Sequence, residues 1–269
     1  MTTTDISYLG LAASGILIGV AIALSLWRHL GIERSVLWAA VRALVQLLLV
    51  GVALGLVVDD GDPILLSWLW IVVMVLFASW TVGRRTKGIP GVTGLALIAF
   101  SAALLVTFGV LFGFGVFEMT GRTVVPLGGM IVGNSLAATA LVARRVHDEI
   151  QDHRDLIEGR LALGRSGTDA FAPHLRSALR TALIPQIETT KAVGIVFLPG
   201  AMVGLILAGT DPAEAVKVQV AVMYLVLGSV ATTTTVMAMG LGRRAFTSDH
   251  RLAATVDSDG TGVQSPDGV

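Results

Sequence analysis

DDGDPILLSWLWIVVMVLFASWTVGRRTK, residues 59–87, is the stretch that decides the fold of this chain. Its central run, Ile64–Val82, is apolar and close in length to the ~20 residues that cross a ~30 Å hydrocarbon core as a helix. Three aspartates precede the run, whereas Arg84, Arg85 and Lys87 follow it. Because basic residues gather in cytoplasmic loops, the stretch predicts a transmembrane helix that ends in the cytoplasm.

The composition of the whole chain is also typical of a membrane protein. Of its 269 residues, 54% are hydrophobic and 14% are charged, and the mean hydropathy is +0.79. A soluble domain averages about 25% charged residues and has too little interior to bury this much apolar surface. The formal net charge is zero, so we expect no nucleic-acid partner. The absence of Cys excludes disulfides, thiolate metal ligands and Cys nucleophiles.

Six further apolar runs extend the pattern to about seven transmembrane helices. Met1–Ser7 carries no basic residue, so the first run is interpreted as a retained helix rather than a cleaved signal peptide. The seven runs are Tyr8–Leu26, Val36–Val58, Ile64–Val82, Gly91–Phe117, Val124–Val142, Ala192–Leu207 and Ala215–Met239.

Basic residues alternate with each crossing and thereby predict the orientation. Of the 19 Lys and Arg residues, only Arg122 and Lys217 fall outside, and Arg42 lies within a span. The pattern predicts an all-α polytopic membrane protein, with its N-terminus outside and its C-terminus in the cytoplasm. Residues 1–246 would form the membrane domain, and the polar residues 247–269 a disordered cytoplasmic tail.

The connection between helices five and six, Arg144–Lys191, is too long for an ordinary loop. We expect a cytoplasmic helical hairpin whose first half extends helix five. Leu161–Gly164 would form a small apolar knob before a turn, Thr168 would cap the second helix, and Pro185 would break or kink the chain before helix six. An exposed apolar knob usually marks a partner site, and an amphipathic hairpin lying on the inner leaflet is the alternative.

Polar residues within helices two and five are candidates for a translocation pathway. Arg42 and Gln46 share a face of helix two at i, i+4, where Arg42 either pairs, snorkels or faces a cavity. Asn134 lies mid-span in helix five, and Gly129-x-x-x-Gly133 permits a close helix contact there. Asn134 either bonds across such a contact or meets cargo together with the sulfur of Met130.

Helix six carries a second set of candidates. Pro199 and Gly200 fall at its centre, where a proline frees a carbonyl and bends the helix, so we expect a hinge there, with Met202 close by. Glu188 and Lys191 stand at its inner mouth at i, i+3, and either pair with each other or form a gate.

The sequence does not assign a metal site. All five His residues fall on the predicted cytoplasmic side, and none has a zinc-binding spacing. The acidic and imidazole groups of His147–His153 suit a solvated helix face better than a metal site. The eight Met residues are ordinary apolar filler by composition, although thioethers suit soft metals.

Several blocks of sequence resemble the FetB (UPF0014) family of iron-export ABC permeases, to which plant aluminium-tolerance permeases are also similar. Arg42–Leu47 resembles its R-A-x-x-Q-L run, and Pro126–Asn134 resembles P-x-x-G-M-I-x-G-N. Arg180–Pro185, Lys191–Gly204 and Ala208–Pro212 continue the resemblance in the same order.

The resemblance implies a membrane-spanning permease subunit in the inner (plasma) membrane of a bacterial cell. It implies export of iron or another metal ion, a homodimer, and a separate ATPase subunit that binds ATP and Mg²⁺. The chain itself has no G-x-x-x-x-G-K-[ST] phosphate loop, so we expect no enzymatic activity and no cofactor bound by this chain. By similarity to the coupling loop of ABC permeases, the ATPase-coupling residues would be Glu158, Leu161, Ala162, Leu163, Gly164 and Thr168.

Three alternatives stay open from the sequence. An ABC permease for a non-metal cargo agrees with every feature above. A secondary transporter driven by an ion gradient is disfavoured because the spans hold no mid-membrane Asp or Glu. A membrane enzyme would need convergent nucleophiles or metal ligands, and a retinal sensor would need a mid-span Lys that Met223–Met239 lacks.

Overall fold

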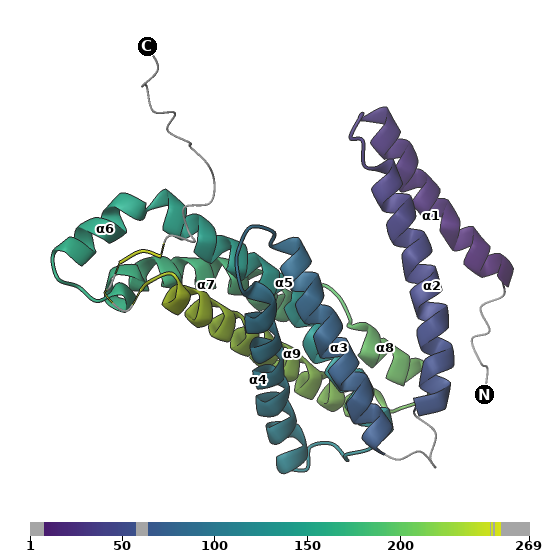
Figure 1. Cartoon of the computed structure of the whole chain (residues 1–269). Helices are drawn as coiled ribbons and strands as arrows, with labels where there is room; N and C mark the ends of the chain where they lie inside the picture. Colours follow the sequence, from purple (N-terminus) through teal and green to yellow (C-terminus); the bar gives the residue numbers. More distant parts are fainter. Residues whose placement is uncertain (1–7, 58–63, 248, 250, 254–269) are drawn as a thin grey trace. The chain divides into compact units, whose positions relative to one another are not determined.

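The computed structural model describes residues 8–57, 64–247, 249 and 251–253, and its described residues form helices and no strand (Figure 1). The chain divides into two units, Met1–Asp62 and Pro63–Val269. The described helices are α1 (Tyr8–Trp27), α2 (Glu33–Val57), α3 (Ile64–Arg85), α4 (Val92–Gly113), α5 (Gly121–Asp152), α6 (Arg154–Ala162), α7 (Gly167–Ala192), α8 (Gly200–Leu207) and α9 (Pro212–Arg244).

The first unit is a helical hairpin of α1 and α2. A turn in which His29 and Gly31 adopt positive φ joins the two helices. Ser25 Oγ donates a hydrogen bond of 2.7 Å to Glu33 Oε1 and so ties the end of α1 to the start of α2. Apart from Ser25, the described side chains of this hairpin are exposed or half-buried within it, and most are apolar. Lipid or other protein must therefore cover them.

In the second unit, α5 and α9 run side by side, and α3, α4 and α7 pack against them (Figure 1). Glycines, which have no side chain, allow the close approach of these helices. A Cβ on Gly128 would overlap Ile71 of α3, and one on Gly240 would overlap Leu95 of α4. A Cβ on Gly129 would meet Met74 of α3 at 3.5 Å, so Gly129 of the expected Gly129-x-x-x-Gly133 pair is in ordinary contact and the closest approach is at Gly128. Among the described residues, no atom lies within 4 Å of a Cβ placed on Gly133.

Several hydroxyl groups inside this unit are paired within the protein. Ser135 Oγ of α5 lies 3.4 Å from Ser229 Oγ of α9, where the two helices pack. Thr139 donates to Ser135 O at 2.7 Å, and Thr234 donates to Val230 O at 2.7 Å. Such bonds to the preceding turn let a polar run remain helical in a medium without water. They explain how α9 accommodates four successive threonines.

Five helices are long and apolar enough to cross a membrane: the described parts of α2, α3, α4, α5 and α9. The described apolar part of α1, Ala13–Trp27, is shorter than this criterion. The structure therefore supports an all-helical membrane protein and five of the seven predicted spans, while the count of seven remains a prediction.

The sixth predicted span is wrong as a continuous helix. α7 runs through Pro185 without a break and ends at Ala192. An irregular stretch follows, in which Gly194 has a φ of 85°, and α8 begins only after Pro199. Pro199 has no N–H to donate, so it fits the cap of a helix and starts α8 instead of bending a longer one.

The expected hairpin between helices five and six is present as α6 and α7. α5 has 32 residues, or about 48 Å at ~1.5 Å per residue, so it is longer than the ~30 Å hydrocarbon core. The turn after α6 contains Gly164 at a φ of 82°, and Leu163 beside it is 84% exposed. The cap of α7 is Ser166, whose Oγ accepts from Asp169 N, and not Thr168, which lies within the first turn.

Part of the predicted tail folds back on α9. Thr247 N donates to Arg251 O at 2.8 Å, and Ala253 N donates to Ala245 O at 2.9 Å. Leu252 packs against the core and lines a small pocket with Glu158 and Leu161. Residues 254–269 of the predicted tail lie outside the described residues.

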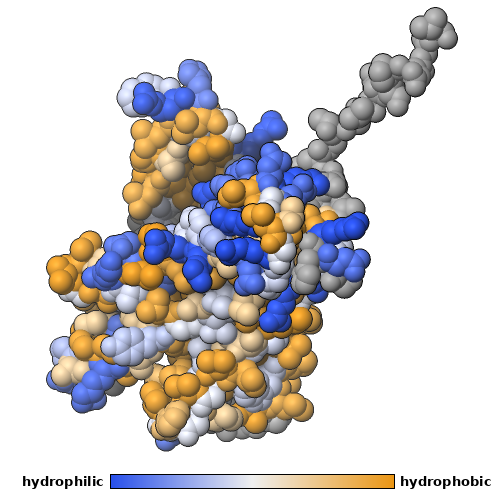
Figure 2. Space-filling model, turned by 90° about the vertical axis from the view of Figure 1, so that its left-hand side faces the viewer, coloured by the Kyte–Doolittle hydropathy of each residue, from blue (hydrophilic) through white to orange (hydrophobic). Residues whose placement is uncertain are grey.

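Basic residues that are far apart in the sequence meet at one end of the second unit. Arg244 of α9 donates to Gly91 O before α4 at 3.0 Å. His147 of α5, Ile89 and Arg244 line one small pocket there. Figure 2, seen from the side of α6, shows hydrophilic residues around the α6–α7 hairpin and hydrophobic residues over the region below it. Within the second unit, the connection before α4 and the ends of α5 and α9 thus share one end, which we call the basic end.

The predicted orientation can be tested by labelling because the chain has no native Cys. Lys87 at the basic end and Glu118 between α4 and α5 are both exposed. We expect Glu118→Cys to react with an impermeant maleimide in intact cells, and Lys87→Cys to react only after permeabilisation. The same accessibility for both variants would contradict the prediction that α4 crosses the membrane between these two positions.

Candidate translocation site

A cavity of about 290 Å³ lies between α5, α7, α8 and α9 in the second unit. Its lining is mixed, with amides, a hydroxyl and two thioethers among apolar groups, and it contains no carboxylate. The lining residues are Met130, Asn134, Gln186, Thr189, Phe197, Pro199, Gly200, Ala201, Gln219, Val222, Met223 and Val226.

The cavity lies near the middle of the membrane-spanning region. α5 and α9 run in the same direction, because both end at the basic end and Ser135 meets Ser229. At ~1.5 Å per residue, Asn134 is about 20 Å from the start of α5, and the lining residues of α9 are about 10–21 Å from its start. Both intervals fall within a ~30 Å hydrocarbon core.

Gln219 provides the most unusual group in the cavity. Its side chain is 4% exposed, and its Oε1 has no hydrogen-bond partner among the described residues. An unpaired buried acceptor costs about 1–3 kcal/mol, so such groups are few and often mark a site that takes a ligand. Gln219 lines the cavity, although its Oε1 is covered in this conformation. Turned into the cavity, the amide oxygen can accept a hydrogen bond or coordinate a cation.

The other polar side chains of the cavity leave acceptor oxygens available. Asn134 Nδ2 donates to Met130 O at 2.8 Å, which commits the amide nitrogen and fixes which end of this amide is the oxygen. Thr189 Oγ1 donates to Pro185 O at 2.9 Å and keeps its lone pairs as acceptors. The cavity can therefore offer several neutral oxygens, and the sulfurs of Met130 and Met223, to one small cation.

The broken helix forms one wall of this cavity. Phe197, Pro199 and Gly200 belong to the irregular segment after α7 and to the start of α8. Val196 N donates to Ala192 O and Gly194 N to Phe197 O, each at 2.9 Å, so part of this backbone is satisfied locally. Irregular backbone at membrane depth is tolerated where it is buried or lines an aqueous cavity. Broken helices of this kind form substrate sites in transporters.

An ion pair lies close to the cavity on α7. Lys191 Nζ donates to Glu188 Oε1 at 2.8 Å, and the two side chains are 66% and 61% exposed within the structure. Since Gln186 and Thr189 line the same cavity as Asn134, this pair stands beside the middle of α5. Charges at such depth face water or protein rather than lipid. The last turns of α7 therefore border an aqueous path or a protein interface.

The structure brings together four of the residues proposed from sequence: Met130, Asn134, Pro199 and Gly200. Sequence reasoning missed Gln186 and Gln219. Gln219 lies within the predicted span Ala215–Met239, two residues after Lys217, and was not singled out there. A lone amide within an otherwise apolar helix was the available signal for it.

Other proposed residues lie outside this cavity. Met202 is half-buried in α8 and does not line it. Arg42 and Gln46 are exposed on α2 in the first unit. The coupling residues lie on the α6–α7 hairpin, where Glu158 pairs with Arg154 at 2.9 Å and Leu161 packs against the core.

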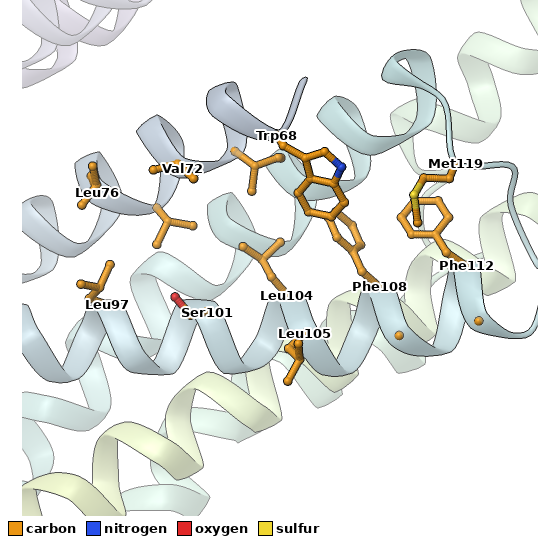
Figure 3. Close-up of a pocket in the computed structure, with 14 residues that line it drawn as sticks. Trp68, Val72, Leu76, Leu97, Ser101, Leu104, Leu105, Phe108, Phe112 and Met119 are labelled. Carbon is orange, nitrogen blue, oxygen red and sulfur yellow. The ribbon is translucent and has the colours of Figure 1, made fainter. Parts of the chain in front are cut away.

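A larger cavity of about 600 Å³ lies between α3 and α4. Figure 3 shows apolar side chains of both helices facing it, with Ser101 the one labelled hydroxyl. Trp68 and Phe108 meet edge to face at its aromatic end, with ring centroids 5.7 Å apart. This groove offers apolar surface and almost no cation ligand, so the smaller amide-lined cavity is the better candidate for an ion.

Comparison with known proteins agrees with a membrane protein. The profile of UPF0014, described as an uncharacterised protein family, matches residues 8–246. This chain belongs to the UPF0014 family. No solved structure matches this UPF0014 chain significantly.

Several curated relatives of this UPF0014 chain are similar over most of their length. It is 34% identical to the "Probable iron export permease protein FetB" of Escherichia coli (strain K12) over 257 residues, which cover 95% of this chain and 98% of that protein. It is 34% identical to the "UPF0014 membrane protein STAR2" of Oryza sativa subsp. japonica over 236 residues, 87% of this chain and 81% of that protein. It is 30% identical to the "Protein ALUMINUM SENSITIVE 3" of Arabidopsis thaliana over 225 residues, 83% of this chain and 81% of that protein.

The unpaired oxygen of Gln219 predicts opposite effects on stability and transport. Gln219→Leu removes an unsatisfied acceptor, so thermal unfolding should show unchanged or higher stability, by up to about 1–3 kcal/mol. Loss of one bond to a charged cargo, about 1.5–3 kcal/mol, should weaken cargo binding roughly 10- to 100-fold. Transport into vesicles measures the second effect.

Ser67→Ala is the matched control. Ser67 Oγ is also buried without a partner among the described residues, but it does not line the cavity. Ser67→Ala should keep transport at the level of the unsubstituted protein. Equal transport by Gln219→Leu and Ser67→Ala would show that the cavity is not part of the pathway.

Proposed function

We propose that this chain is the membrane-spanning permease subunit of an ABC transporter that exports iron or another metal ion from the cytoplasm. A separate ATPase subunit would bind ATP and Mg²⁺ and supply the energy. The observation that carries the proposal is the mid-membrane cavity, with the unpaired Gln219 Oε1 in its wall. The relative named as a probable iron export permease supports the choice of cargo.

The chemistry of the cavity suits passage better than storage of a cation. Its polar ligands are neutral amides, a hydroxyl and thioethers, and its lining holds no carboxylate to retain the ion. Conduction requires binding that is favourable enough for entry and weak enough for release. The Glu188–Lys191 pair beside the cavity would provide a polar border for the path.

The α6–α7 hairpin is the proposed docking element for the ATPase. Leu163 is 84% exposed at its tip, beside a glycine turn that holds it away from the core. α5 and α7 both extend from the hairpin to the cavity, so movement of the hairpin would reach Asn134 and Thr189 along rigid helices.

A homodimer would complete the membrane assembly. The exposed Glu188–Lys191 pair needs water or protein beside it at membrane depth. Gly133, Gly200 and Gly204 present surfaces that no described residue approaches within 4 Å of an added Cβ, and small residues favour helix contacts in membranes. We propose a bacterial inner (plasma) membrane as its location, as for a bacterial permease.

A permease for a non-metal amphiphile is the second candidate. The apolar groove between α3 and α4 favours it, because its volume of about 600 Å³ and its lining suit an acyl chain or aromatic ring (Figure 3). The two candidates share the ATPase-driven mechanism and differ in the cavity that the cargo uses.

The docking role of the hairpin predicts loss of coupling without loss of fold. Leu163→Asp replaces an exposed side chain, so thermal stability should stay within about 0.5 kcal/mol. We expect co-purification with the ATPase subunit, and cargo-stimulated ATP hydrolysis, to be abolished.

Leu156→Asp is the control, because Leu156 is an exposed leucine too but lies within α6, away from the tip. It should retain both activities. Wild-type yield of ATPase and unchanged stimulation with Leu163→Asp would contradict docking through the tip.

The cargo class can be tested in cells that lack this gene. We expect these cells to accumulate iron or another metal when it is supplied in excess, because export has been lost. Elemental analysis of washed cells measures this, and complementation with Ser67→Ala should restore the wild-type level. Unchanged content of every metal would favour the amphiphile candidate.

A further inference from the structure

Two imidazoles and one carboxylate meet where α5 ends against α7. Glu149 Oε2 lies 3.0 Å from His174 Nδ1 and 3.4 Å from His153 Nδ1. One potential ligand atom from each residue lies within 4.8 Å of the other two. This cluster belongs neither to the mid-membrane cavity nor to the exposed tip of the hairpin.

The spacing of these atoms matches that of ligands around one transition-metal ion. Nitrogen and oxygen ligands bind tetrahedral Zn²⁺ at about 2.0–2.2 Å, which places two ligands of the same ion roughly 3.3 Å apart. The two distances from Glu149 Oε2, 3.0 and 3.4 Å, lie on either side of this value. All three ligand atoms lie within 4.8 Å of one another, and the two imidazole rings stand 4.4 Å apart between centroids, so an ion between them requires the rings to turn their nitrogens toward it.

We propose that Glu149, His153 and His174 form a binding site for a divalent transition-metal cation of the Zn²⁺, Co²⁺ or Fe²⁺ class. Two imidazoles with one carboxylate suit these ions, whereas Ca²⁺ and Mg²⁺ prefer oxygen ligands alone. Three protein ligands leave a position for water.

The surroundings give an ion access from solution and a preorganised carboxylate. The side chain of His153 is 44% exposed, whereas those of Glu149 and His174 are 18% and 9% exposed. Ser177 of α7 donates a hydrogen bond to the Glu149 carboxylate and holds it in place. Such second contacts orient a ligand and contribute to metal affinity.

Arg160 of α6 competes with the metal for His174. Its Nη1 lies 3.4 Å from His174 Nε2 and donates to Ala170 O at 2.9 Å. A carboxylate only accepts and a guanidinium only donates, so without metal His174 carries its proton on Nδ1 and accepts at Nε2. A metal on Nδ1 moves that proton to Nε2, where it faces the Arg160 donor. Metal binding therefore weakens the contact between His174 and Arg160.

The site changes the contacts of His174. Without metal, His174 of α7 contacts both Glu149 of α5 and Arg160 of α6, whereas with metal it stays linked to Glu149, gains a link to His153 between α5 and α6, and loses the Arg160 contact. If the hairpin docks the ATPase, as the proposed function holds, then metal in solution loosens α6 and adjusts docking. Metal binding at the cluster does not depend on docking.

Cobalt titration of the purified full-length protein tests the site without transport or ATPase. After chelation, added Co²⁺ should produce the visible absorption bands of a low-coordinate complex, with one ion per chain. His153→Ala and His174→Ala should each raise the Kd for Co²⁺ at least about tenfold, since the loss of a residue that only orients a metal ligand already costs 10- to 100-fold. His147→Ala removes a histidine from the same helix outside the cluster and should leave the Kd unchanged.

Arg160→Gln should change the affinity for Co²⁺ in the opposite direction. It removes the competing donor and supplies a carbonyl that can accept from Nε2, so Co²⁺ should bind more tightly. Weaker binding by this variant would overturn the competition between Arg160 and the metal. Because His174 is buried, the exposed His153 serves as the decisive variant if His174→Ala unfolds.

Two results would overturn the site itself. One is an unchanged Co²⁺ spectrum and Kd in folded His153→Ala. The other is loss of the bands in Gln219→Leu but not in the histidine variants, which would place the ion in the mid-membrane cavity. Bound Co²⁺ at the cluster together with unchanged metal content in the gene deletion would refute the proposed metal export and leave the site intact.

Discussion

The packing of α5 against α9 holds the second unit together, and Ser135 meets Ser229 at 3.4 Å where the two helices touch. In hydrocarbon no water replaces a missing partner, so every polar group along these helices must be satisfied inside the protein. The hydroxyls of Thr139 and Thr234 meet this requirement by bonding to carbonyls one turn earlier. Close packing beside them depends on positions such as Gly128, where a side chain would overlap α3.

The same constraint makes the exceptions informative. Gln219 Oε1 is buried and unpaired in the wall of a cavity, although its neighbours on α9 are satisfied or apolar. The cavity exists because α7 and α8 are separated by an irregular segment that cannot fill the space of a regular helix. The irregular segment between α7 and α8 and the unpaired amide of Gln219 thus give the packed bundle a polar cavity at mid-depth.

The long helices α5 and α7 connect this cavity to the α6–α7 hairpin. α5 continues beyond the length that a bilayer requires, and α7 returns along it from the hairpin to the cavity. The hairpin therefore has both an exposed tip, at Leu163, and an anchoring cluster around Glu149, His153, His174 and Arg160. A rearrangement of this cluster can be transmitted to the cavity only through α5 and α7, both of which line the cavity.

The sequence by itself determined membrane insertion, the helical class and the existence of the α6–α7 hairpin, because apolar run length and the placement of Arg and Lys act locally along the chain. It also indicated Asn134 and Met130, since polar and soft groups in an apolar run are visible without a fold. It missed the cap at Ser166 and the helical passage through Pro185, because both depend on the local backbone geometry that was finally adopted.

Only the tertiary structure decided which of these groups meet. The sequence already placed Glu149 and His153 four positions apart in one segment, but His174 lies 21 positions beyond His153 in a chain that turns through Gly164, and sequence spacing gave no reason to add it. Gln219 and Asn134 line the same cavity because α5 and α9 pack in parallel, and no local sequence pattern reveals that packing. Ligand sets and cavities depend on distances between helices, and those distances are set by packing rather than by order along the chain.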